Sequence, residues 1–89
     1  MNTSEKIEIV CNNMAQFLIA KNVAYGDSAL NPVRIFSKAD SVEQIKIRID
    51  DKLNRLMQGH EFGRDDTVKD LCGYLILLMV TEMKEEVEK

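Results

Sequence analysis

The segment from Val42 to Leu56 constrains the fold most, because it repeats apolar and charged residues with the spacing of a two-sided helix. Five of its six apolar residues recur every three or four positions and form one face: Val42, Ile45, Ile49, Leu53 and Leu56. Four of its seven charged residues follow the same spacing and form a second face, which we call the cationic face: Arg48, Asp51, Lys52 and Arg55. A helix with one apolar side must bury that side against other elements, so the pattern predicts a protein of several packed helices.

Two other segments carry apolar stripes at helical spacing. A first helix is expected over residues 3–23, capped by Asn2 or Thr3, with this stripe: Ile7, Val10, Cys11, Met14, Phe17, Leu18 and Lys21. A last helix is expected over residues 64–86, with this stripe: Val68, Leu71, Cys72, Leu75, Leu78, Met79 and Met83. The middle helix is expected over residues 40–57, because Asp40 to Glu43 has the form of a capping box and Gly59 is a typical helix stop.

Residues 24–39 separate the first two predicted helices and contain the only proline, Pro32. The apolar residues of this loop are expected to pack on the helices as a lid or rim: Leu30, Val33, Ile35 and Phe36. The 89 residues are expected to form one domain, 1–89, which is an all-α, small three-helix bundle with a long loop between its first and second helices. So short a chain buries a limited share of its surface alone, which favours a homo-oligomer.

Charge and composition narrow the classes of partner. The net charge of −3 gives no general basic footprint for a nucleic-acid polymer. The longest apolar run, Leu75 to Val80, is far shorter than a membrane span, and the N-terminus carries no signal-peptide core. The two cysteines, Cys11 and Cys72, form no CxxC pair and are expected to be buried free thiols. These features together favour a cytoplasmic protein.

Three segments carry candidate ligand-binding residues. The cationic face groups three cations around Asp51, which suits a ligand that bears phosphates, although a solvated helix laced by ion pairs has the same spacing. In the last helix, one stripe beside a helical glycine, Gly73, holds Asp66, Asp70, Tyr74 and Leu77. The end of the first helix adds Lys21, Tyr25 and Gly26. Asp70 is expected to pair with one of the cations, as part of a structural network or of a ligand site.

A metal site is the weaker expectation. Asp51, Asp66 and Asp70 can in principle hold Mg²⁺, but three nearby cations oppose a dedicated metal cage, so no resident cofactor is expected. The single histidine, His60, is expected to be exposed in a polar connection, and the sequence shows no pair of a nucleophile and a base.

The order of three sequence elements resembles the phage-associated family called nucleotide-modification-associated domain 1. These elements are KNVAYGDS from Lys21, IRIDDKLNRL from Ile47 and DDTVKDLCGYLIL from Asp65. The resemblance covers most of the domain and implies a link to nucleotides more than it implies a reaction. It also implies that these positions are the family-type ones: Lys21, Tyr25, Gly26, Asp27, Arg48, Asp51, Lys52, Arg55, Asp66, Asp70 and Tyr74.

Three functions remain open at this point. The favoured one is a small phage-type protein that binds a nucleotide or cyclic nucleotide through the cationic face and sequesters it, as an anti-defence nucleotide sponge. The alternative is a Mg²⁺-dependent nucleotide hydrolase or nucleotide-modifying enzyme, with Asp51, Asp66 and Asp70 on the metal. The third is a helical protein-interaction module whose charged face is structural.

Overall fold

The chain folds into three helices, as the apolar spacing predicts. In the computed structural model, which describes residues 1–59 and 66–83, the helices are α1 (Thr3–Ala24), α2 (Ser41–Gln58) and α3 (Thr67–Thr81). The expected all-α class is thereby confirmed, and these two ranges contain no strand. None of their helices combines the length and the apolar content needed to cross a membrane.

Side-chain caps define the starts of the first two helices. Asn2 caps α1 with a complete capping box, in which its side chain accepts a 2.8 Å bond from Glu5 N–H and Glu5 Oε1 accepts a 2.9 Å bond from Asn2 N–H. Asp40 caps α2 by accepting a 2.8 Å bond from Glu43 N–H. Gly59 ends α2 in the left-handed conformation, with φ at 73°. The sequence predicted each of these boundaries to within one residue.

The last helix is shorter than expected. It was predicted over residues 64–86, but α3 begins at Thr67, after Asp66 as its N-cap, and ends at Thr81. Glu82 and Met83 lie beyond the helix, whereas residues 64–65 and 84–86 fall outside the described ranges. The last turn of α3 holds no basic residue and is followed by Glu82, whose negative charge is unfavourable at the negative end of a helix dipole. The apolar stripe expected for this helix includes Met83, which lies beyond the end of α3 at Thr81.

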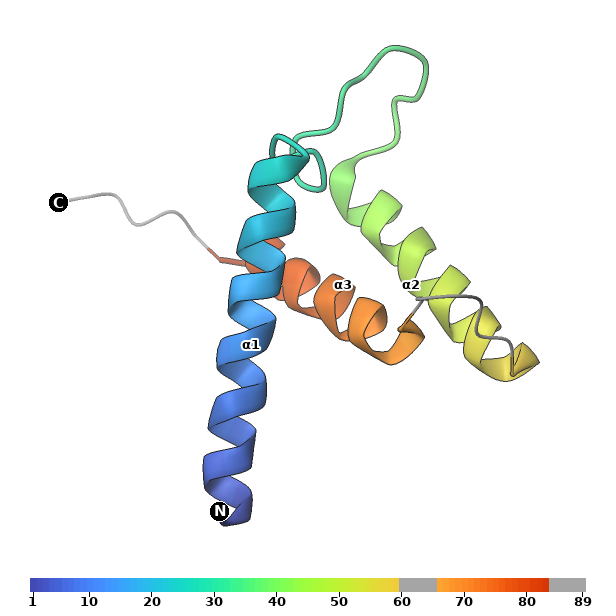
Figure 1. Cartoon of the computed structure of the whole chain (residues 1–89). Coiled ribbons are helices and arrows are strands. Elements are labelled where there is room, and N and C mark those ends of the chain that lie inside the picture. The colour runs from blue at the N-terminus through green and yellow to red at the C-terminus, as the bar shows by residue number, and fades with distance from the viewer. Residues whose placement is uncertain (60–65, 84–89) are drawn as a thin grey trace, which may run out of the picture.

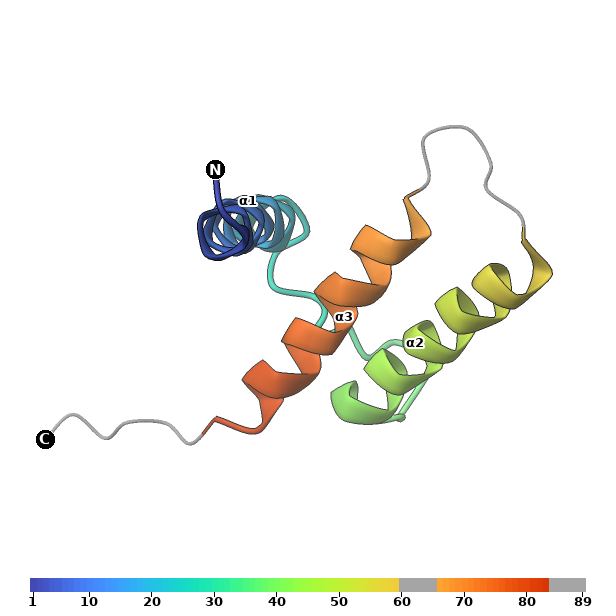
Figure 2. The same ribbon diagram turned by 90° about the horizontal axis from the view of Figure 1, so that it is seen from below.

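The helices α1 and α2 lie on two sides of α3. Figure 1 shows α2 and α3 as neighbours that run in roughly opposite directions, while α1 crosses α3, and Figure 2 shows α3 between the other two. Only two hydrophobic side chains are buried among the described residues, Met14 of α1 at 7% exposure and Ile45 of α2 at 2%. The three helices thus form an open arrangement around α3 with a very small core.

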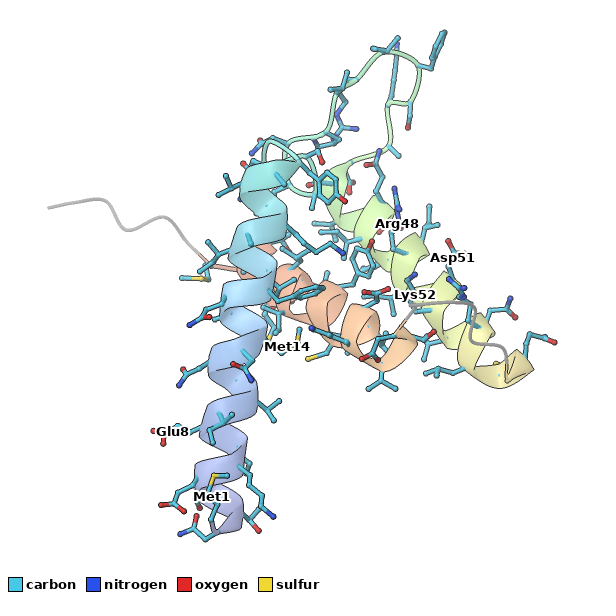
Figure 3. All side chains as sticks on the ribbon, viewed as in Figure 1. Met1, Glu8, Met14, Arg48, Asp51 and Lys52 are labelled. Carbon is cyan, nitrogen blue, oxygen red and sulfur yellow. The ribbon has the colours of Figure 1, made fainter. Side chains whose placement is uncertain are left out.

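The expected core stripes are largely exposed, which corrects the sequence prediction. On α1, Ile7 and Val10 are 58% and 59% exposed, and Cys11 is exposed although it was expected to be buried. On α3, Leu75 and Met79 also remain in contact with solvent. The reason is geometric, because α1 crosses α3 near Met14 and its N-terminal half extends beyond the other helices (Figure 3). The spacing marks apolar faces on the helices but does not show which parts of them are covered.

The connection between α1 and α2 begins with a tight turn and then stands away from the helices. Gly26 and Asp27 adopt left-handed backbone conformations, with φ at 64° and 61°, and Asp27 N–H donates to Asn22 O at 2.9 Å. The expected packing of this loop as a lid is wrong for three side chains that are 75–95% exposed: Val33, Ile35 and Phe36. Within this loop, the Arg34 guanidinium donates a hydrogen bond to the backbone carbonyl of Ala39.

Gly73 marks the closest approach of α1 to α3. It is buried, and a Cβ atom at this position would lie 2.9 Å from Cδ2 of Leu18. The close approach of another helix, a usual reason for a glycine within a helix, is therefore present at Gly73. A larger side chain at residue 73 would separate the two helices.

We expect Gly73→Leu to lower the free energy of unfolding by about 1–3 kcal/mol, because the added carbons overfill the crossing. Gly73→Ala is the control, and we expect it to be about as stable as the original chain. The Leu18 side chain, which ends at Cδ2, can shift to make room for one carbon, and alanine adds about 1 kcal/mol of helix propensity. Urea unfolding followed by circular dichroism measures both variants. A leucine variant as stable as the original chain would contradict the close approach.

Candidate functional site

A cavity of about 450 Å³ lies where the three helices and the turn after α1 come together. Its wall combines apolar side chains with cationic, amide, hydroxyl and aromatic ones. The lining residues are Phe17, Leu18, Lys21, Asn22, Tyr25, Ser28, Ala29, Gln44, Ile45, Arg48, Asp70, Gly73, Tyr74 and Leu77. All three sequence elements that were expected to build a site therefore contribute to one cavity.

The α1 end contributes Lys21 and Tyr25. Lys21 lies in the last turn of α1, and its Nζ is 4.9 Å from the centre of the Phe17 ring. Tyr25 ends the helix, with its N–H donating to Lys21 O at 2.9 Å, and its side chain is 66% exposed. A second ammonium, that of Lys69, lies 4.1 Å from the same ring centre. Two cations thus flank Phe17 at one side of the cavity.

The helices α2 and α3 provide the opposite wall. Gln44 and Arg48 line it from α2, one helical turn apart. Asp70, Tyr74 and Leu77 line it from α3, and their spacing of four and three places them on one face, as the sequence predicted. The cationic face reaches the cavity through Arg48 only, because its other three residues do not line it.

The charge of Asp70 is compensated within the fold. Its Oδ2 lies 3.5 Å from Lys52 Nζ, and the two side chains are only 25% and 17% exposed. Asp70 was expected to pair with a cation of α2, and the structure assigns that role to Lys52. Within residues 1–59 and 66–83, neither Lys21 nor Arg48 forms an ion pair. Among the described residues, the cavity therefore presents two cations that have no carboxylate within ion-pair distance.

Five predicted site residues line the cavity and five do not. The first group is Lys21, Tyr25, Arg48, Asp70 and Tyr74. Of the others, Gly26 shapes the turn after α1, Lys52 pairs with Asp70, and Asp66 caps α3 by accepting a 3.1 Å bond from Lys69 N–H. Asp51 is exposed on the side of α2 away from α3 (Figure 3), and Arg55 is half-buried farther along the same helix.

The carboxylates proposed for a metal are not assembled. In the part of the chain that the structure describes, no three His, Cys, Asp or Glu side chains are grouped so that they can hold one ion. Asp66 and Asp70 are instead occupied by a helix cap and an ion pair. The predicted position of His60 lies outside the described residues.

Sequence reasoning missed several polar residues of the cavity. Gln44 lies four residues before Arg48, so an extension of the cationic face by one turn would have included it. Asn22 also lines the cavity and directly follows Lys21 in the sequence. One apolar residue was missed as well: Phe17, which lies one helical turn before Lys21 and belongs to the expected core stripe, forms part of the cavity wall. The missing signal was the crossing of α1 over α3, which the sequence does not encode locally.

Comparisons of the chain with protein-family models, with curated proteins and with solved structures gave no match. The resemblance to a phage-associated nucleotide family therefore rests on the three sequence elements alone.

Proposed function

We propose that the protein binds a nucleotide-derived, phosphorylated ligand in the cavity between its three helices and sequesters it. One observation carries the proposal: a cavity of about 450 Å³ is lined by two cations without an ion-pair partner in the described chain and by two tyrosines. This volume falls in the range of roughly 300–1,000 Å³ that is typical of small-molecule sites. The same combination of groups matches the chemistry of a nucleotide.

The two cations suit the phosphates. Arg48 offers a planar guanidinium that can donate two parallel hydrogen bonds to one phosphate, and Lys21 offers a compact ammonium from the facing helix. Because Lys52 already neutralises Asp70, that carboxylate opposes an anionic ligand less than a bare aspartate would. The cavity is thus suited to a ligand with at least one negative charge.

The remaining wall suits a base and a ribose. Tyr25 and Tyr74 offer aromatic surfaces on which a base can stack. Asn22, Gln44 and Ser28 offer amide and hydroxyl groups that can both donate and accept hydrogen bonds. Such groups can recognise the edge of a base or the hydroxyls of a sugar.

We place this binding protein in the cytoplasm of a phage-infected cell, as an anti-defence sponge that acts as a homo-oligomer. The phage setting follows from the sequence resemblance. The very small core supports the oligomer, because Met14 and Ile45 are the only buried hydrophobic residues in the described chain and so short a chain is often stabilised by association. No reaction is proposed, because the cavity residues that carry the proposal, Lys21 and Arg48, supply groups for binding phosphates.

Isothermal titration against mononucleotides, dinucleotides and cyclic nucleotides tests the proposal. We expect at least one of them to bind, and the matching nucleoside without phosphate to bind at least about tenfold more weakly, because it lacks the charge-assisted hydrogen bonds to Arg48 and Lys21. Absence of binding across the panel at millimolar concentrations would contradict the proposal.

A second measurement separates sequestration from turnover. The bound nucleotide is incubated with the protein and Mg²⁺, released by heat and analysed by chromatography. We expect the ligand to return intact and in the amount added. A product peak that grows with time would instead favour the hydrolase alternative.

A further inference from the structure

The N-terminal half of α1 is a helix without a packing partner in the described chain. Every residue from Thr3 to Asn13 is exposed, and Figure 3 shows Glu8 on the part of the helix that extends beyond α2 and α3, with Met1 at its N-terminal end. Helical segments of this length are marginal in water on their own. This one also contains residues that favour a helix only weakly: Ile7, Ile9, Val10, Asn12 and Asn13. Its helix would therefore gain stability from a packing partner outside the chain.

One side of this segment offers an apolar surface on which a packing partner can bind. Ile7, Val10, Cys11 and Met14 follow the 3.5-residue spacing of a helix–helix seam, and we call them the α1 stripe. The stripe is continuous with a contact that already exists, because Met14 is buried where α1 meets α3 and Leu18 packs against Gly73. Toward the N-terminus, Ile7 and Val10 remain 58% and 59% exposed. The seam thus extends beyond the surface that residues 1–59 and 66–83 provide.

The total exposed surface of the chain leaves room for a further contact of standard size. The chain exposes 7311 Å², whereas a compact folded monomer of its 10.2 kDa mass would expose about 5,300 Å². The excess is larger than the roughly 800 Å² that each partner buries in a standard protein interface. A second copy of the same chain can cover part of this excess without any other component.

We infer that the α1 stripes of two copies pack against each other in a two-fold symmetric dimer. Such a contact joins the same surface on both chains, so Ile7 and Val10 of each copy meet the stripe of the other. Charge does not oppose this pairing, because only three of the first 20 residues are charged: Glu5, Lys6 and Glu8. The inference rests on the homo-oligomer in the proposed function and assigns its interface.

Ile7 and Ile9 provide a matched pair of test positions. They have the same side chain, lie two residues apart and therefore point about 200° apart around the helix. Ile7 belongs to the α1 stripe, whereas Ile9 lies on the far side. Sedimentation equilibrium without nucleotide measures the mass of the full chain and of the Ile7→Asp and Ile9→Asp variants, and circular dichroism checks their helix content.

We expect the original chain and Ile9→Asp to show twice the chain mass of 10.2 kDa. Ile7→Asp should raise the dimer dissociation constant roughly a hundredfold, because a buried aspartate would lie without a partner in the seam. A dimer that is equally stable in both variants, or lost equally in both, would overturn the assignment. A monomeric original chain would overturn the dimer itself, yet nucleotide binding could still be detected, so the two failures are distinguishable.

Cysteine alkylation gives a second readout that needs no variant. Cys11 lies within the α1 stripe and is exposed in the single chain, so the dimer should cover it. We expect iodoacetamide to modify Cys11 at least about tenfold more slowly at concentrations at which the dimer forms than after dilution to the monomer. An equal rate at both concentrations would contradict the inferred interface.

Discussion

Replacing Arg48 by glutamine should weaken nucleotide binding about ten- to a hundredfold, which is the usual cost of losing charge-assisted hydrogen bonds to a phosphate. Arg48 lines the same cavity as Lys21, and its side chain is exposed rather than built into the fold. The substitution should therefore leave the stability of the helices nearly unchanged. Isothermal titration with the nucleotide that binds the original chain best measures the effect.

Lys46→Gln is the matched control for this experiment. Lys46 lies on the same helix and its loss removes the same unit of positive charge, but it does not line the cavity. It pairs at the surface with Glu43, at 3.6 Å, where both side chains are more than half exposed. We expect its nucleotide affinity to stay within about twofold of the original chain. Equal losses in both variants would mean that total charge, and not the cavity, attracts the ligand.

Replacing Lys52 by methionine should lower the free energy of unfolding by about 2 kcal/mol, a value between those of exposed and buried ion pairs. The pair with Asp70 has a distance of 3.5 Å, and its side chains are 17% and 25% exposed. Methionine keeps the length of the side chain but leaves the Asp70 carboxylate poorly solvated and without its cation. Urea unfolding at neutral pH measures the loss.

Two further variants check this assignment. Lys52→Met combined with Asp70→Leu should recover most of the stability, because the double variant removes both charges together. Lys46→Met breaks the exposed pair with Glu43 and should cost less than about 0.5 kcal/mol. Similar losses for Lys46→Met and Lys52→Met would contradict the view that burial makes the Lys52–Asp70 pair important.

The sequence predicted the helices well because their signals are local. Apolar spacing identified the three segments, while Asn2, Asp40 and Gly59 marked their ends through hydrogen bonds and backbone conformations that span only a few residues. The packing was not predictable in the same way. Ile7 and Phe36 both belong to apolar patterns, yet 58% and 95% of their surfaces are exposed, since burial depends on which elements reach them.

In the candidate site, too, the positions of residues within one helix were predictable, whereas the contacts between helices were not. Asp70, Tyr74 and Leu77 share a wall of the cavity, as their helical spacing required. Lys52 and Asp51 were both expected beside a ligand, but the first bonds across to α3 and the second faces away from it. Their difference depends on the rotation of α2 against α3, which no short segment specifies.

The position of α3 between the other two helices has a consequence for how a ligand would act. Within residues 1–59, α1 and α2 do not pack on each other, and each is held mainly through α3. A phosphate that touches both Lys21 and Arg48 would join these two helices directly. The ligand would then hold α1 and α2 together as part of the structure. Its binding would be thermodynamically coupled to the packing of the three helices.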